Sequence, residues 1–315
     1  MRVLVTGVSG FAGPVVARAL VAGGHEVHGL ARHPPAAARV KDLPLTVHAG
    51  DVCDAGWLAR LLADVAPAGV VHLAAVAEPA AAERDPERAY RTNLGGTLAL
   101  LAAVRAVTPS TRLVVVSSSS VYGAVEPERL PATEDVPLRP LSVYGASKAA
   151  AEIAALQWGR AHGLDVVVAR PFNHTGPGQS PAYVCAALAS QVAAIEAGRQ
   201  PPVLAVGNVD PVRDVSDVRD IAAGYVALLE RGRSGTVYNL CTGEGSSVAT
   251  LIALLRSLAR VPLRARIDPA RRRAHDVDRL VGDATRASSD TGWKPRFALL
   301  DTLATVLDDW RRREA

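Results

Sequence analysis

Two residues near the middle of the chain, Tyr144 and Lys148, have the types and the spacing for proton transfer. They stand four apart at the start of an alanine-rich stretch with helical periodicity, so both side chains lie on one helical face. A free phenol, with a pKa of about 10, exchanges protons poorly near neutrality. A cation held roughly 4 to 6 Å away favours the phenolate, so we expect Lys148 to make Tyr144 a better proton-transfer group. Lysine is otherwise found only at positions 41 and 294, among 35 basic residues, which indicates a chemical reason for Lys148.

A glycine-rich turn close to the N-terminus predicts a second site. Gly7, Gly10 and Gly13 follow a short apolar run at residues 2–6, which reads as a buried strand, and lead into helical apolar spacing at residues 11–20. The order G-x-x-G-x-x-G lets the backbone bend sharply, approach a ligand closely and pack the helix against the strand. Free amides at the helix N-terminus then face a pyrophosphate. The turn therefore predicts a dinucleotide site.

The elements that position these residues form an alternating pattern. Apolar runs that read as strands follow at residues 26–30, 45–48, 69–73, 111–117 and 165–169, with helical stretches between them. Asp85 and Pro86 provide an N-cap and a first-turn proline for the helix that carries Asn93. The alternation implies an α/β fold with a doubly wound parallel sheet, whose ligands bind beyond the carboxyl ends of the strands.

The pattern loosens after the sixth strand. We expect a helix at 182–197, another introduced by 212–220, a core strand at 236–240, a helix capped by Ser246 or Ser247, and a last helix at 298–313. A chain of 315 residues, 49% hydrophobic, is long enough for a large core with a smaller lobe. The expected division is a dinucleotide-binding domain of residues 1–172 plus about 215–248, and a smaller, mostly C-terminal α/β substrate lobe of about 173–214 plus 249–315.

Composition narrows the class of protein. No apolar span of membrane length and no signal-peptide pattern occur, so we expect a cytoplasmic protein without a membrane partner. Cys53, Cys185 and Cys241 are scattered without metal-ligand spacing, which favours free thiols and no metal site. The net charge of +4 is spread along the chain, so a solvated surface is expected and no nucleic acid.

The end of the second strand bears on which dinucleotide is bound. In NAD-binding versions of such a sheet an acidic residue there holds the ribose hydroxyls, whereas an arginine accommodates the additional phosphate of NADP. This chain has Ala31 and Arg32 there, with His33 and Arg39 close behind. NADP(H) is therefore favoured over NAD(H).

A serine run completes a set of motifs. Residues 117–120 are all serine and run into Val121-Tyr122-Gly123. Together with the glycine turn and Tyr144-x-x-x-Lys148, this run gives the chain a resemblance to the extended short-chain dehydrogenase/reductase family of nucleotide-sugar enzymes. The resemblance covers essentially the whole chain, and members of this family have the Rossmann fold. The resemblance implies that Tyr144 is the general acid or base, that Lys148 also holds the nicotinamide ribose, and that Ser118, ahead of its neighbours, hydrogen-bonds the reacting oxygen.

The same resemblance implies the remaining contacts. Cofactor contacts are expected from Gly7, Gly10, Phe11, Gly13, Arg32, Asp51, Val52, Ala74, Ala75, Asn93, Tyr144, Lys148, Pro171 and Phe172. Substrate contacts are expected from Ser119, Asn173, Arg213 and Arg273. The two arginines suit a diphosphate because a guanidinium can bind two oxygens at once.

The positions after Ser118 bear on the reaction. Nucleotide-sugar 4,6-dehydratases resembling this chain need an acidic pair or a single glutamate there, whereas this chain has Ser119 and Ser120, so dehydration is not expected. Residues 170–179, 206–214 and 283–295 resemble the GDP-6-deoxy-D-mannose reductases. That subgroup implies NADPH-dependent reduction of GDP-4-keto-6-deoxy-D-mannose to GDP-D-rhamnose. Ser120 stands where the subgroup pattern has an acidic residue, which leaves the identity of the keto sugar open.

Two other functions are compatible with the motifs. A 4-epimerase acting on a UDP- or dTDP-hexose would use the same three catalytic residues with a retained NAD, which Arg32 disfavours. A nucleotide-sensing protein without activity is disfavoured because Tyr144 and Lys148 are both present. Related enzymes dimerise through the helix after Asp85 and the helix of Tyr144, so the resemblance also implies a homodimer.

Overall fold

The computed structural model describes residues 1–32, 39–271 and 277–314. In chain order the helices and strands are β1 (Arg2–Thr6), α1 (Gly13–Ala22), β2 (Glu26–Ala31), β3 (Leu45–Ala49), α2 (Ala55–Val65), β4 (Gly69–His72), α3 (Pro79–Arg84), α4 (Pro86–Tyr90), the π-helical η2 (Arg91–Gly95), α5 (Gly96–Val107), β5 (Arg112–Val116), the 3₁₀ turns η3 (Ser119–Val121) and η4 (Pro127–Arg129), α6 (Val143–His162), β6 (Val166–Pro171), β7 (Asn173–Thr175), α7 (Val184–Glu196), β8 (Val203–Val206), β9 (Val212–Asp217), α8 (Val218–Arg231), β10 (Val237–Leu240), β11 (Gly245–Ser247), α9 (Val248–Leu258), β12 (Arg264–Ile267), η5 (Pro269–Arg271), β13 (Arg279–Leu280), α10 (Thr285–Thr291) and α11 (Leu299–Glu314).

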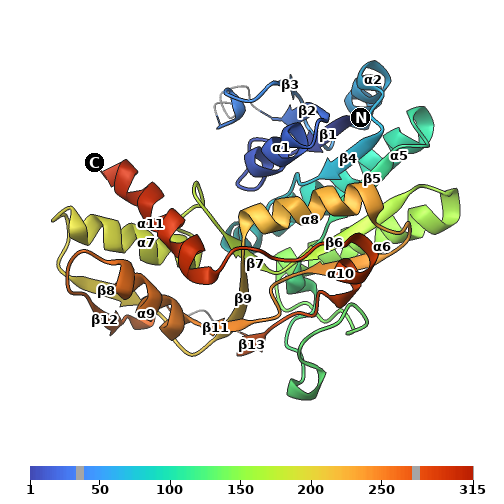
Figure 1. The fold of residues 1–315 in the computed structure, drawn as a ribbon. Helices are drawn as coiled ribbons and strands as arrows, with labels where there is room; N and C mark the ends of the chain where they lie inside the picture. The colour runs from blue at the N-terminus through green and yellow to red at the C-terminus, as the bar shows by residue number, and fades with distance from the viewer. Residues whose placement is uncertain (33–38, 272–276, 315) are drawn as a thin grey trace.

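The large sheet confirms the expected doubly wound architecture. Its strands lie in the order β10-β6-β5-β4-β1-β2-β3 and every pairing is parallel. Side chains alternate between the two faces: in β5, Leu113 and Val115 pack with α2, α5 and α6, whereas Val114 packs with α1 and α8 on the other side. Both faces are therefore covered by helices, which explains the nearly continuous apolar runs (Figure 1).

A smaller lobe lies beside the carboxyl ends of this sheet, at the lower left of Figure 1. It contains the sheet β11-β9-β13, in which β7 also pairs with β9, and the parallel pair β12-β8. Helices α7, α9 and α11 enclose its apolar core, with Leu204, Leu255 and Leu303 fully buried. Strand β10 belongs instead to the large sheet, and helix α8 packs on that sheet. The exact division into two domains stays a prediction.

Most expected elements are present, with three differences. Helix α1 begins at Gly13 rather than at residue 11, because residues 9–12 form the turn itself. The helix after Asp85 is interrupted by the π-helical η2, although Asp85 caps it as expected by accepting from the Arg88 amide at 3.0 Å. The stretch 212–220 is mostly strand β9, which pairs on both sides, and the helix follows it.

The structure shows why glycine occupies the turn after β1. Gly7 has φ +71°, and a Cβ there would lie 2.9 Å from backbone atoms of Ala74 at the end of β4. At Gly13 a Cβ would lie 2.3 Å from the carbonyl oxygen of Val8, so only glycine lets α1 start so close to the turn. Since strand order reverses between β1 and β4, this close approach forms the crevice where such sheets bind ligands.

The described helices include none with both the length and the apolar character needed to cross a membrane.

Substitution of Gly7 by alanine is expected to destabilise the protein more than the same change at Gly24. Gly24 has φ +76° with nothing within 4 Å of an added Cβ, so Gly24→Ala costs only the strain of a left-handed residue, about 1–2 kcal/mol. Gly7→Ala adds the collision with Ala74, on the order of a further 1–3 kcal/mol. Urea unfolding of both variants measures the difference, and equal losses would show that β4 gives way freely.

Candidate active site

The Tyr144 phenol lies against Ser118. This contact brings the start of α6 next to the end of β5. Ser118 caps η3: its hydroxyl accepts a hydrogen bond from the Ser120 amide at 3.1 Å and lies close enough to the Tyr144 phenol to lower the pKa of that phenol. At Gly145 a Cβ would lie 2.6 Å from the carbonyl oxygen of Ser120, so the first turn of α6 packs directly on the serine loop. Of the serine run, Ser118 is therefore the member placed beside the phenol, while Ser117 points to Glu152.

Lys148 lies one helical turn beyond Tyr144 and is only 3% exposed. Burial lowers the pKa of its ammonium group to about 8, against the charge of Glu152, which raises it. Within the described ranges, no residue accepts a hydrogen bond from this ammonium. Its donors are therefore available to hydroxyl groups of a bound molecule, as expected for a residue that holds a ribose.

The expected effect of Lys148 on Tyr144 stays a prediction. Burial raises the pKa of the Tyr144 phenol, and the nearby Ser118 hydroxyl lowers it. Desolvation of the phenolate outweighs the contribution of Ser118. Tyr144 keeps its proton at neutral pH, which is the state that a proton donor requires.

A chain of buried hydrogen bonds runs from the glycine turn to α6, the helix that carries Tyr144. The Ala74 amide donates to Thr6 Oγ1 at 3.1 Å, and His72 bridges Thr6 and Thr97 at 2.8 and 3.0 Å. Burial and the positive charge of Lys148 lower the pKa of His72 to about 3, so the imidazole is neutral. His72 received no role from the sequence, although a histidine inside an apolar strand is itself a sign of a buried partner.

Asn93 continues this chain toward Tyr144. Its amide group donates to Ser147 Oγ at 2.8 Å, and Ser147 donates to the Tyr144 carbonyl at 2.8 Å. Asn93 also pairs with both backbone groups of Val76 through its side chain, at 2.7 and 3.2 Å. Both amide hydrogens are therefore used within the protein. The cofactor contact expected of Asn93 stays a prediction. In the structure this residue links the backbone of Val76 to Ser147 of α6.

The turn after β1 fits the phosphates of a dinucleotide. The amides of Phe11 and Ala12, which precede the first turn of α1, find no backbone or side-chain acceptor among the described residues. The Phe11 ring stacks on His174 of β7, with centroids 5.9 Å apart. A cavity of about 670 Å³ lies against this turn, lined by Ser9, Gly10, Phe11, Arg39, Gly178, Gln179, Ser180, Pro181, Tyr183 and Arg313. Free amides and two arginines suit an anionic ligand.

The other expected cofactor contacts lie along the same edge of the sheet. Arg32 is exposed directly after β2. The rest stand at or just beyond the carboxyl ends of strands: Asp51 and Val52 after β3, Ala74 and Ala75 after β4, and Pro171 and Phe172 at the end of β6. The fold thus brings one continuous edge together, although the individual contacts stay predictions.

The expected substrate residues are more widely spread. Ser119 is buried next to Ser118, Asn173 is exposed on β7, and Arg213 lies on β9, where it donates to the Val212 carbonyl at 3.0 Å. Arg273 lies outside the described residues. Two further buried residues at this edge, Glu152 and Arg170, received no role from the sequence.

Comparisons with known proteins agree with this fold. The family model described as GDP-mannose 4,6 dehydratase matches residues 4–306. GDP-6-deoxy-D-mannose reductase from Pseudomonas aeruginosa is 39% identical over 99% of this chain and 98% of its own length. UDP-glucose 4-epimerase from Streptomyces lividans is 32% identical over 98% of this chain and 95% of its own. The solved structure of RMD from Pseudomonas aeruginosa complexed with NADPH has a TM-score of 0.87 and 38% identity, covering 99% of both chains.

Replacement of Lys148 by methionine is expected to stabilise the protein at pH 7 by about 1–3 kcal/mol, because each unit by which the pKa is lowered corresponds to about 1.4 kcal/mol. The unfolded lysine keeps its proton up to a pKa of about 10.4, whereas the folded one loses it near 8. Wild-type stability therefore rises with pH between these values, and the advantage of the variant shrinks.

Urea unfolding at pH 7 and at pH 9.5 measures this effect. Lys294→Met, at an exposed lysine, is the matched control and is expected to change stability by less than about 0.5 kcal/mol at either pH. A Lys148→Met variant no more stable than the wild type at pH 7 would contradict the buried charge.

Proposed function

Because the chain belongs to the GDP-mannose 4,6-dehydratase family of extended short-chain dehydrogenases/reductases, we propose that it is an NADPH-dependent reductase of a nucleotide-linked 4-keto-6-deoxyhexose. The proposed substrate is GDP-4-keto-6-deoxy-D-mannose and the product GDP-D-rhamnose. This assignment of substrate is supported by the full-length similarity to the reductase from Pseudomonas aeruginosa.

One observation carries the type of reaction: residues 117–120, which follow β5 beside Tyr144, are all serine, so this segment contributes hydroxyl groups and no carboxylate of its own. Ser118 lies beside the Tyr144 phenol, and the next two side chains are Ser119 and Ser120. Elimination of water needs an acid and a base at these positions, and a serine hydroxyl is a poor substitute for either. The site can therefore move one proton together with a hydride, which is what reduction of a ketone requires.

The chain's own residues divide the work as follows. When bound, NADPH supplies the hydride that adds to the keto carbon. Ser118 hydrogen-bonds the keto oxygen, and Tyr144 donates its proton to that oxygen as negative charge develops there. The ammonium of Lys148 stabilises the phenolate that Tyr144 then becomes, because the two side chains share one helical face.

The choice of cofactor rests on the end of β2. Arg32 follows that strand and is exposed, where a guanidinium can bind the 2′-phosphate of NADPH. The structure of RMD from Pseudomonas aeruginosa complexed with NADPH supports this choice.

The test is NADPH oxidation on addition of GDP-4-keto-6-deoxy-D-mannose, with NADH run beside it and the sugar product identified. Oxidation of NADPH with formation of GDP-D-rhamnose supports the proposal, and Arg32→Gln should then reduce the preference for NADPH. The similarity to UDP-glucose 4-epimerase from Streptomyces lividans makes 4-epimerisation the second candidate. No NADPH oxidation, with NAD retained through purification and interconversion of UDP- or dTDP-hexoses, would identify that activity instead.

Tyr144→Phe is expected to lower kcat by about 10²- to 10⁴-fold, the usual contribution of a general acid, without loss of the fold. Phenylalanine keeps the ring and removes only the proton donor. Circular dichroism and urea unfolding check the fold. Turnover by Tyr144→Phe at more than a tenth of the wild-type rate would remove Tyr144 from the mechanism.

We propose a second copy of the chain as the macromolecular partner and the cytoplasm as the compartment. The supporting observation for the dimer is apolar exposure on the two helices expected to pair: Ile153 of α6 is 57% exposed and Tyr90 at the end of α4 is 39% exposed. Sedimentation equilibrium is expected to give twice the chain mass of 32.9 kDa. A monomer at micromolar concentration would contradict the dimer, and cell fractionation tests the compartment.

A further inference from the structure

Glu152 extends the row formed by Tyr144 and Lys148. It follows Lys148 by four residues on α6, so the three side chains lie on one face of the helix. Glu152 is only 1% exposed. A carboxylate removed from water is costly unless charged or hydrogen-bonding groups compensate it, so the groups around Glu152 determine what it can do.

The Glu152 carboxylate joins three elements that carry expected active-site residues. It accepts a hydrogen bond from Ser117 Oγ at 2.6 Å, at the end of β5 and next to Ser118. Its two oxygens also accept from the guanidinium of Arg170, with Nε 3.1 Å from each. Arg170 is 4% exposed and immediately precedes Pro171 in β6. One side chain of α6 thus holds the ends of both β5 and β6.

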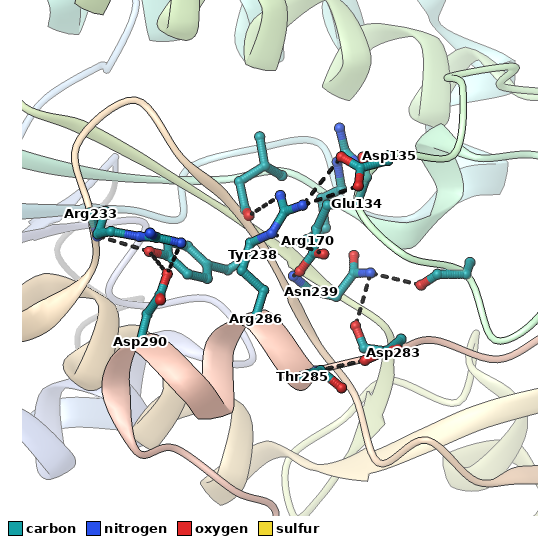
Figure 2. Close-up of polar contacts among 12 residues, drawn as sticks. Glu134, Asp135, Arg170, Arg233, Tyr238, Asn239, Asp283, Thr285, Arg286 and Asp290 are labelled. Carbon is teal, nitrogen blue, oxygen red and sulfur yellow. Dashed lines mark hydrogen bonds and ion pairs between the residues drawn. The ribbon is translucent and has the colours of Figure 1, made fainter.

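Arg170 cannot turn to other partners without breaking further contacts. Its Nη1 donates to the Tyr122 hydroxyl at 2.8 Å and to the Glu134 carbonyl at 3.0 Å. The Tyr122 hydroxyl donates to Asn239 at 2.7 Å. Figure 2 shows Arg170 beside Glu134 and Asn239, with Arg286 of α10 reaching Glu134 and Asp135. Since the far side of the guanidinium is fixed in this way, the position of Arg170 constrains Glu152.

We propose that Glu152 is a positioning residue for the reaction: Ser117 and Arg170, at the ends of β5 and β6, hold its carboxylate so that its negative charge lies one helical turn beyond Lys148. The proposal rests on the proposed function in one respect, since that function gives Lys148 its role. Glu152 itself acts through Lys148 and Ser117.

The groups around Lys148 support an electrostatic role. His72 faces Lys148 from β4 and is neutral, and Tyr144 lies one turn away on the same helix and keeps its proton. Tyr225 of α8 lies close enough to Tyr144 for a charge on Tyr144 to raise the pKa of Tyr225, which burial raises further. Arg170 lies behind Glu152. Glu152 is therefore the one negative charge of this set, and it raises the pKa of Lys148 against the effect of burial.

A direct test measures the titration of Lys148 by NMR. With lysine labelled at the ε-carbon only three signals arise, and Lys148→Met assigns the buried one, while Lys41 and Lys294 are exposed references. The wild-type midpoint is expected near 8. Glu152→Gln is expected to lower it by about one unit or more, the usual effect of losing an opposite charge at short range.

The matched control is Glu196→Gln in the small lobe. Glu196 is another largely buried carboxylate that pairs with an arginine, accepting from Arg311 at 2.7 and 2.8 Å. Its loss is expected to lower stability without moving the Lys148 midpoint. Glu152→Asp keeps the negative charge, so its Lys148 midpoint is expected to stay close to the wild-type value.

The pH profile of kcat/KM separates positioning by charge from general damage. If the midpoint falls by one unit from about 8, the fraction of charged Lys148 drops about threefold at pH 7.5 and about eightfold at pH 8.5, but hardly at pH 6. Glu152→Gln should therefore approach the wild-type kcat/KM at low pH, and Ser117→Ala should lower the rate equally at all pH values.

Two outcomes would overturn the proposal: an unchanged Lys148 midpoint in folded Glu152→Gln, or a uniform loss of rate across pH. If Glu152→Gln does not fold, Glu152→Gln with Arg170→Met removes both buried charges, and the Lys148 midpoint is again expected below the wild-type value. A wild-type enzyme that does not oxidise NADPH with the keto sugar would refute the proposed function alone, because the titration needs no substrate.

Discussion

The constraint on which this structure depends is that polar groups at the carboxyl edge of the large sheet are buried and have to satisfy one another. Both faces of the sheet are covered by helices, so water cannot compensate the polar side chains that line its central strand ends. One continuous chain of hydrogen bonds satisfies these side chains and includes Thr6, His72, Thr97 and Asn93. An unsatisfied member would cost on the order of 1–3 kcal/mol, so the chain holds β1, β4 and α5 in one arrangement.

Features that depend on local backbone chemistry could be predicted from the sequence. The order of the glycines, the apolar strand before them and the helix after them each restrict the backbone within a few residues. The structure shows that restriction directly at Gly7 and Gly13. The same holds for the central parallel strands β1, β4, β5 and β6, whose apolar runs are buried on both faces of the sheet. For that reason the first six strands were predicted within one or two residues, and with them the edge where ligands bind.

Features that depend on partners far apart in the sequence were missed. The sequence of β9 resembles the start of a helix. It forms a strand because it pairs with β7, β11 and β13, which come from three other regions of the chain. His72 and Arg170 are single polar residues in apolar strands, and nothing local reveals that Thr97 and Glu152 meet them. The burial of Tyr144 was missed for a related reason: spacing on a helix gives proximity to Lys148, whereas the burial that raises the pKa of the phenol is a property of the whole fold.

Burial at this edge also explains why a lysine and a glutamate are found together in it. A buried ammonium ion lowers the stability of the folded chain, and a buried carboxylate does so as well unless cations compensate it. Arg170 compensates Glu152 by itself, as the multiple hydrogen bonds between them show. Lys148 is then a second cation beside a carboxylate that already has a partner, which packing alone would not require. A methionine of similar length would fill the same space at no electrostatic cost, so stability does not explain the positive charge beside Tyr144.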